Sequence, residues 1–285
     1  MELSARDIAL FELLIRYRHL RSSYLYAFAG GASETRFKER LGDLFHEGYL
    51  DRPNEQWDFA SARYSAVVHE IGKRGLDTLR ALGSGASFSV RRDTTVNRQF
   101  LHRLMICEAL ASIELATRVN HGLRFIGWPE IWARAPEETR ASVAPSKLSL
   151  SSGGAVVPDA VFGLEYQLDG TKTYRFFALE ADRGTMPILR SRPGQTSYLG
   201  KLHTYNEALT QGVHKRHWGV PNLLVLTLTT SAMRVADIVA KLGTSNSAFL
   251  FKAVEARSLA KPMPQLLVEP WQRAGHAPLR ISEAV

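Results

Sequence analysis

The hydrophobic and polar positions of the first eighty residues predict a helical N-terminal region. Apolar residues three and four positions apart mark one face of the first helix, and they are Ile8, Phe11, Leu14 and Ile15. The predicted helices cover residues 5–19, 21–28 and 33–48. Ser4 and Ser33 occupy N-cap positions, where a side-chain hydroxyl accepts a hydrogen bond from a first-turn amide.

Shorter apolar runs after the third helix predict a two-stranded ribbon. Tyr49-Leu50 and the strand-like segment 63–68 flank a polar loop, and a closing helix begins near Ile71. Three helices followed by a ribbon are the order of a winged helix-turn-helix. The phrases that resemble many bacterial members of that group are Glu47-Gly48-Tyr49-Leu50-Asp51-Arg52 and Gly72-Lys73-Arg74-Gly75-Leu76.

This resemblance implies that the third helix enters the major groove of double-stranded DNA. Its candidate DNA-binding residues are Ser33, Thr35, Arg36, Lys38 and Arg40. Arginine and lysine on such a helix reach guanine edges or phosphates. The alternative is a winged helix that contacts only proteins, because residues 1–90 hold twelve basic and twelve acidic residues and carry no net charge.

Composition places a domain boundary after this region. Residues 83–87 are small and flexible, and two arginines follow at 91 and 92. We therefore expect two domains, with the DNA-binding domain over residues 1–83, a linker over 84–95 and a second domain over 96–285. With 285 residues, the chain is long enough to give each domain its own core.

The second region alternates helical and strand patterns, which predicts a mixed α/β domain. Helices are expected over 96–120, 196–211 and 232–242, with a helical insertion over 129–143. Strands are expected over 123–128, 223–228 and 248–251, and a hairpin over 157–183 that turns at Asp169-Gly170. The tail after Ala260 shows no clear element.

The hairpin brings acidic residues together at one end. Successive side chains of a strand point to opposite faces, so Glu180 and Asp182 share a face with Phe176 and Ala178. Asp159, at the start of the first strand, reaches the same end. Three ionised carboxylates so close together repel one another, so a bound cation is the simplest way to hold them.

The hairpin resembles the PD-(D/E)XK nuclease superfamily, in which a Pro-Asp opens one strand and a Glu-x-Lys ends the next. Pro158-Asp159 and Glu180-Ala181 match, but Asp182 stands in the position of the lysine. The resemblance covers residues 96–230 and implies a mixed sheet flanked by helices. It also implies that Asp159 and Glu180 hold Mg²⁺ or Mn²⁺. The alternative is a hairpin with surface carboxylates at its ends.

Two further residues join the candidate catalytic set of Asp159, Glu180 and Asp182. Lys201 lies on the stripe of the 196–211 helix that faces the sheet, and it can substitute for the missing lysine or else cover the apolar face with its stem. Glu108 lies among apolar residues of the 96–120 helix, where a carboxylate finds a partner or its pKa rises. The resemblance suggests a place beside Asp159, and the alternative is a solvated helix edge.

A closer resemblance is to the replication-relaxation family of plasmid and mobile-element proteins. The phrase that carries it is Glu180-Ala181-Asp182-Arg183-Gly184-Thr185, preceded by the Pro-Asp and followed by the Lys201-Leu202 helix. Most of the chain takes part, including the predicted N-terminal winged helix. The resemblance implies DNA handling during plasmid replication or transfer.

Charge and cysteine content indicate the kind of partner and the cellular compartment to expect. The net charge of +8 lies entirely in residues 91–285, which hold 24 basic and 16 acidic residues. Such an excess favours an anionic partner. Cys107 is the one cysteine, which excludes an internal disulfide and suits a reducing cytoplasm. No apolar run is long enough for a membrane span, and the N-terminus does not resemble a signal peptide.

Two functions remain open. The first is a DNA-binding protein of a plasmid or mobile element, acting in replication, mobilisation or its regulation, whose nuclease-like domain does not cut. Asp182 in place of lysine favours it. The second is a Mg²⁺-dependent DNA endonuclease or nickase that uses Asp159 and Glu180. Other replication or transfer proteins, or a second copy of the chain, are further expected partners. The basic and aromatic stretch His214–Trp218 is either a phosphate contact or a solvated helix end.

Overall fold

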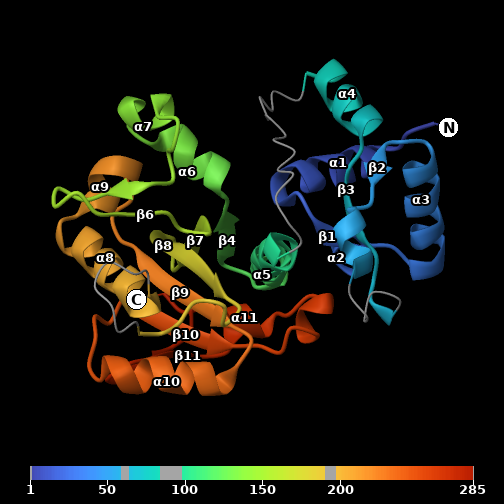
Figure 1. The fold of residues 1–285 in the computed structure, drawn as a ribbon. Helices are drawn as coiled ribbons and strands as arrows, with labels where there is room; N and C mark the ends of the chain where they lie inside the picture. The colour runs from blue at the N-terminus through green and yellow to red at the C-terminus, as the bar shows by residue number, and fades with distance from the viewer. Residues whose placement is uncertain (1, 59–63, 84–97, 190–196, 285) are drawn as a thin grey trace. The chain divides into compact units, whose positions relative to one another are not determined.

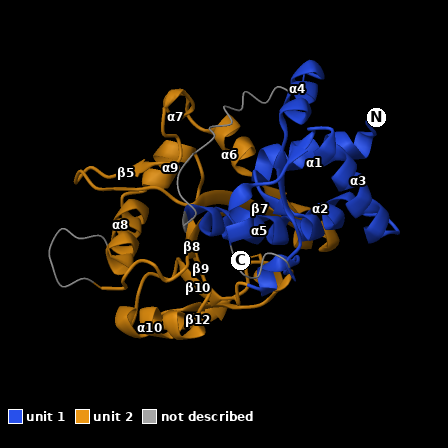
Figure 2. Ribbon diagram, turned by 45° about the vertical axis from the view of Figure 1, so that its right-hand side comes forward, with its two compact units in different colours: residues 1–115, 257–263 blue, residues 116–256, 264–285 orange. Residues whose placement is uncertain are grey.

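A computed structural model describes residues 2–58, 64–83, 98–189 and 197–284, and within them the chain forms two compact units. Unit 1 comprises Met1–Leu115 and Arg257–Met263, and unit 2 comprises Ala116–Ala256 and Pro264–Val285 (Figure 2). The mixed α/β character and the two-part organisation agree with the sequence. The boundary differs from the expected 83/96 division, and the proposed linker 84–95 lies outside the described residues.

Unit 1 begins with helices and a small sheet (Figure 1). Its helices are α1 (Ala5–Tyr17), α2 (Ser22–Ala29), α3 (Glu34–His46), the 3₁₀ turn η1 (Asn54–Asp58), α4 (Lys73–Ala81) and α5 (Arg98–Val119), which ends in unit 2. Its strands are β1 (Leu20–Arg21), β2 (Leu50–Asp51) and β3 (Val68–Ile71). They form an antiparallel sheet in the order β1-β3-β2, of which β1 was not predicted.

Local sequence signals set the ends of these helices. The Ser4 hydroxyl accepts from the Asp7 amide, and the Asp7 side chain accepts from the Ser4 amide, which is a capping box at the start of α1. Ser33 caps α3 through the Arg36 amide at 3.3 Å, as predicted. At the α3–β2 junction the backbone passes so close to Gly72 that a Cβ there would lie 2.4 Å from the Gly48 carbonyl oxygen.

Helix α5 and a late segment complete unit 1, which explains the shifted boundary. Cys107, Leu110 and Ala111 of α5 pack on the core formed by α1, α2 and α3. The segment Arg257–Met263 lies against α2, where the Tyr24 hydroxyl donates to the carbonyl oxygen of Leu259 or Lys261, each 3.0 Å away. The start of the tail is therefore ordered, because its backbone carbonyl groups accept hydrogen bonds from Tyr24, a distant residue that the local sequence pattern does not predict as a partner.

Unit 2 is built on a mixed sheet with strand order β12-β11-β10-β9-β8-β7-β4. The strands are β4 (Leu123–Ile126), β7 (Ala160–Leu168), β8 (Thr171–Asp182), β9 (Leu224–Thr229), β10 (Phe249–Ala253), β11 (Trp271–Arg273) and β12 (His276–Leu279). Strands β8, β9 and β10 are mutually parallel, and the remaining neighbours are antiparallel. The chain therefore runs as the antiparallel meander β4-β7-β8 and then crosses over to β9.

The other elements of unit 2 connect these strands. They are α6 (Trp128–Arg134), α7 (Glu137–Ala141), the hairpin β5 (Leu148–Ser149) and β6 (Ala155–Val156), α8 (Tyr198–Thr210), α9 (Val213–Trp218), α10 (Ala232–Leu242) and α11 (Gln265–Val268). The 3₁₀ turn η3 (Ser258–Ala260) precedes α11 in the chain and belongs to unit 1. The predicted bounds of α10 are confirmed. The helical insertion at 129–143 is present as α6 and α7, whereas β5 and β6 were not predicted.

The predicted hairpin over residues 157–183 is confirmed, but its first strand begins later than expected. Asp169 and Gly170 both have positive φ, 47° and 78°, as the two central residues of a type I′ turn require. Ala160 pairs with Leu179 and Leu168 with Thr171, so the ladder runs the whole length of β7. The first strand starts at Ala160, three residues later than Val157, which leaves Asp159 just outside the ladder.

One face of the sheet carries the core that positions the site. Residues of β7 to β10 that point to this face pack against α8, α9 and α10, and they include Val161, Ala178, Val225, Phe249 and Phe251. Aromatic residues fill the opposite face, where Phe162 and Phe177 stack with ring centroids 4.9 Å apart. Among the described residues, no helix combines the length and apolar character that a bilayer crossing requires.

Candidate functional site

The predicted acidic residues meet at the carboxyl end of β8, and we call this cluster the β8 site. It consists of Asp159, Glu180, Asp182, Lys201, Tyr205 and Arg234. Because β7 and β8 are antiparallel, the start of β7 lies beside the end of β8, and the Ala181 amide donates to Asp159 Oδ2 at 2.8 Å. Glu180 and Asp182 share the face that α8 and α10 cover, as the strand alternation predicted.

Glu180 is the most deeply buried acid of the β8 site, at 3 % exposed. Lys201 Nζ of α8 donates to its Oε2, and the Tyr205 hydroxyl, one turn further along the same helix, donates to its Oε1. Burial raises the pKa of Glu180 to about 7, with a further rise from the charge of Asp159, while Lys201 opposes the change. The charge of Glu180 therefore titrates near neutral pH.

Asp182 has a partner that sequence analysis missed. Arg234 Nε, in the first turn of α10, donates to Asp182 Oδ2, and the Gly184 amide donates to Oδ1 at 2.9 Å. Arg234 also donates to the Met186 carbonyl oxygen, which ties the chain after β8 to α10. A sequence signal existed. Arg234 is the basic residue in the first turn of the helix after β9, the strand that pairs in parallel with β8.

The β8 site balances its charge with protein groups. Both oxygens of Glu180 and both oxygens of Asp182 already accept hydrogen bonds. Among the described residues, no group of three or more histidine, cysteine, aspartate and glutamate side chains is arranged to hold a metal ion. A divalent cation does not fit here unless these donors first leave. Lys201 and Arg234 supply positive charge to Glu180 and Asp182, and the expectation of a bound Mg²⁺ or Mn²⁺ stays a prediction.

Glu108 lies in unit 1, whereas Asp159, Glu180 and Lys201 lie in unit 2. Its Oε1 accepts from Arg21 Nε at 2.6 Å, and its side chain is 3 % exposed. Burial raises the pKa of Glu108 to about 8 against the opposing effect of Arg21. Glu108 therefore pairs with Arg21 of β1, which excludes the alternative of a solvated helix edge, and its place beside the Asp159 carboxylate stays a prediction.

The α3 residues that were predicted to bind DNA fall into two groups. Thr35, Arg36 and Lys38 are exposed, and Lys38 forms an ion pair with Glu34 at 2.8 Å. Arg40 instead donates to both carboxylate oxygens of the buried Asp7, at 3.2 and 2.7 Å. Ser33 serves as the N-cap. Arg40 therefore holds α3 against α1, whereas Thr35, Arg36 and Lys38 lie on the solvent-exposed face of α3.

The basic stretch His214–Trp218 forms α9 and divides in the same way. His214 and Trp218 are buried, and burial lowers the pKa of His214 to about 4. His217 contacts the Pro145 carbonyl oxygen at 3.0 Å. Only Lys215 and Arg216 of this helix are exposed. The stretch is therefore largely a packing element of unit 2.

Together, these features define a two-unit protein with a mainly helical N-terminal unit and a mixed-sheet unit that carries an acidic, cation-paired site. The chain belongs to the replication-relaxation family, whose model matches residues 11–224. This match spans both units and includes α3 and the whole β8 site except Arg234. No curated protein and no solved structure matches the chain.

Proposed function

We propose that the protein binds double-stranded DNA in the replication or relaxation of a plasmid or other mobile element, with unit 1 acting as a winged helix-turn-helix. The observation that carries the proposal is the element order α1-β1-α2-α3-β2-β3 with its antiparallel β1-β3-β2 sheet. In a winged helix, α3 is the groove-reading helix and β2-β3 is the wing. Membership of the replication-relaxation family supports the biological setting.

The side chains of α3 suit this role. Phe37, Leu41 and Leu44 are buried and fix the helix to the core, while Thr35 and Arg36 face solvent near its N-terminus. Residues near the start of a recognition helix are those that reach base edges. The net charge of +8 on the chain adds a sequence-independent attraction to phosphates.

The test is a mobility-shift titration on a duplex selected from a random library by the wild-type protein. Arg36→Ala should weaken binding by about 1–3 kcal/mol, because a guanidinium that contacts guanine or phosphate is lost. Arg80→Ala is the matched control, since Arg80 is an exposed arginine on α4 of the same unit. Equal affinities for Thr35→Ala/Arg36→Ala and the control would overturn the role of α3.

For unit 2 we infer a nuclease-like fold of the PD-(D/E)XK type whose β8 site is structural. The order β4-β7-β8-α8-β9, with a meander and then a parallel crossover, supports the fold, and α5 precedes it in the chain but lies mainly in unit 1. Engagement of Glu180 by Lys201 and Tyr205, and of Asp182 by Arg234, supports a structural role, because these contacts occupy all four carboxylate oxygens.

A second candidate is a DNA endonuclease or nickase that requires Mg²⁺ or Mn²⁺. One observation favours it: Asp159, Glu180 and Lys201 are neighbours at the end of β8, and the lysine absent from the motif is supplied by α8. The assay is cleavage of supercoiled and linear DNA with and without each cation. Cleavage that Asp159→Ala and Glu180→Gln both abolish would establish this candidate, and intact DNA with wild-type protein would leave the structural role.

A further inference from the structure

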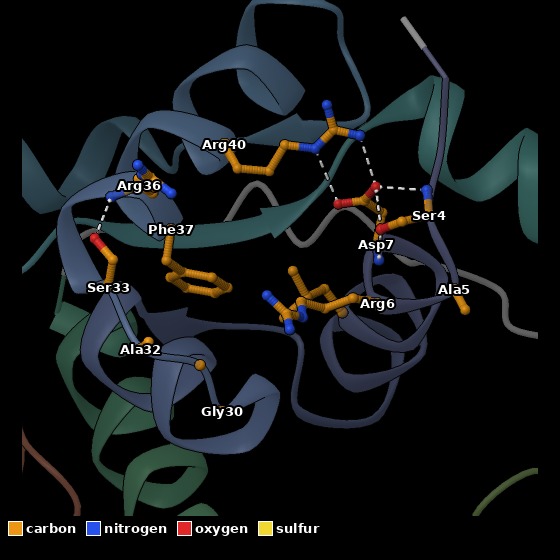
Figure 3. Close-up of a pocket in the computed structure, with 12 residues that line it drawn as sticks. Ser4, Ala5, Arg6, Asp7, Gly30, Ala32, Ser33, Arg36, Phe37 and Arg40 are labelled. Carbon is orange, nitrogen blue, oxygen red and sulfur yellow. Dashed lines mark hydrogen bonds and ion pairs between the residues drawn. The ribbon is translucent and has the colours of Figure 1, made fainter.

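A hollow of about 710 Å³ opens on unit 1 between the start of α1 and the α2–α3 turn (Figure 3). The residues that line it are Ser4, Ala5, Arg6, Asp7, Leu10, Gly30, Gly31, Ala32, Ser33, Arg36, Phe37 and Arg40. Three of them are arginines and one is an aspartate. Because the arginines outnumber the aspartate, the hollow carries a net positive charge.

The charges in the hollow are not balanced by its own acid. Asp7 is held by Arg40 at 2.7 Å, so that pair is neutral. Among the described residues, neither Arg6 nor Arg36 forms an ion pair, and Figure 3 shows the two on different sides of the hollow. Glu34, on the first turn of α3, is itself neutralised by Lys38 at 2.8 Å. Two guanidinium groups thus remain for an anion.

The wall that carries these groups is held in place by other contacts. The Tyr26 hydroxyl donates to the Gly31 carbonyl oxygen at 2.7 Å, and its ring lies 5.4 Å from that of Phe37. Gly30 and Gly31 have φ of 63° and 132°, which side-chain-bearing residues rarely adopt. The Arg6 Nη1 atom would lie 3.6 Å from a Cβ at Gly31, so the guanidinium rests against this turn.

We propose that this hollow binds a phosphate group through Arg6 and Arg36, and that the phosphate belongs to the backbone of the DNA read by α3. Guanidinium groups match the planar, bidentate geometry of phosphate oxygens. Arg36 links the hollow to the solvent face of α3, and Arg6 comes from α1, outside the recognition helix. The choice of DNA as the source of the phosphate rests on the proposed function, whereas the phosphate chemistry rests on the hollow alone.

The decisive variant is Arg6→Ala in the full chain, because Arg6 lies outside α3. Each duplex phosphate that a protein neutralises contributes about 0.9 to the slope of log affinity against log salt concentration. Arg6→Ala should lower that slope by about 0.9, so a fourfold rise in salt should cost the variant roughly 3.5-fold less affinity than wild type. The loss should be equal on several duplexes of unrelated sequence, since a phosphate carries no sequence information.

Arg80→Ala controls for net charge, because it removes one positive charge from an exposed helix of the same unit. A salt slope changed by Arg6→Ala and not by Arg80→Ala supports the proposal. Arg6→Gln, which keeps the side-chain length, replaces Arg6→Ala if the latter fails to fold by circular dichroism. Identical slopes and affinities for Arg6→Gln, Arg80→Ala and wild type would overturn DNA as the source.

A test with inorganic phosphate shows whether the hollow binds the phosphate of DNA or a free phosphate. It also tests the hollow if the wild-type protein binds no DNA. The melting temperature is compared in sodium phosphate and sodium chloride of equal ionic strength. A rise in phosphate that Arg6→Ala removes, with DNA binding unaffected or absent, supports the hollow as a site for a free phosphate. No rise in phosphate together with no effect of Arg6 on DNA binding overturns the hollow as a phosphate site.

Discussion

Replacing Lys201 by methionine should make the stability of unit 2 depend steeply on pH. Methionine keeps most of the apolar stem and removes the ammonium group that donates to Glu180 Oε2. Glu180 is 3 % exposed, so after the replacement its carboxylate has the Tyr205 hydroxyl as donor but no cation. A buried carboxylate without a cation is strongly disfavoured relative to its protonated form. The pKa of Glu180 should therefore rise further above about 7.

The sign of the wild-type effect follows from that pKa. Glu180 has a folded pKa of about 7 against an ordinary 4.5, so the folded state binds the proton more tightly than the unfolded state. Stability from this group is fully present below pH 4.5 and is lost as the pH rises to about 7. The difference between these two pKa values corresponds to a change of about 3 kcal/mol in the free energy of unfolding, at 1.36 kcal/mol for each pKa unit.

The cost of losing Lys201 should depend on whether Glu180 is charged. Removing one partner of a fully buried ion pair costs about 3–5 kcal/mol. The Lys201 side chain is 27 % exposed, so water compensates in part and we expect about 1–3 kcal/mol at pH 8. At pH 5 Glu180 is protonated, and the cost should fall below about 1 kcal/mol. Lys201→Met/Glu180→Gln should restore most of the stability at pH 8.

Urea denaturation followed by tryptophan fluorescence at pH 5 and pH 8 measures these differences. Trp128, Trp132, Trp218 and Trp271 all lie in unit 2, so the signal reports mainly on the unit that contains Glu180. Lys241→Met, at an exposed position of α10, is the matched control. An equal loss at both pH values, or no rescue by Glu180→Gln, would show that Lys201 acts through packing alone.

Two further outcomes follow from unit 1. Burial raises the pKa of Glu108 to about 8, so its contribution to the free energy of unfolding is fully present below pH 4.5 and is lost as the pH rises to about 8. Glu108→Gln should keep the contact with Arg21 and remove most of this pH dependence. Urea titrations followed by circular dichroism measure the difference. Gly72→Ala should destabilise unit 1 by about 3 kcal/mol or more, since its Cβ would lie 2.4 Å from the Gly48 carbonyl oxygen, whereas Gly42→Ala, which meets nothing within 4 Å, should not destabilise it.

Local pattern in the sequence determined the elements and some of their details. Helical spacing gave α1 and α3, and Ser33 was identified as the cap of α3. The Asp169-Gly170 signal gave the turn of the central hairpin, since only a few residue types tolerate positive φ at both positions. Strand alternation put Glu180 and Asp182 on one face. These features depend on residues within a few positions of one another.

The partners of the charged residues were decided by the tertiary structure. Asp182 meets Arg234, 52 residues later, and Glu108 meets Arg21, 87 residues earlier. Nor does the local sequence reveal that Arg257–Met263 returns to unit 1. A buried carboxylate must find a donor, so the sequence predicts that each has a partner. Which donor it finds depends on how strands and helices pack, because periodicity fixes the direction of a side chain but not the element that it faces.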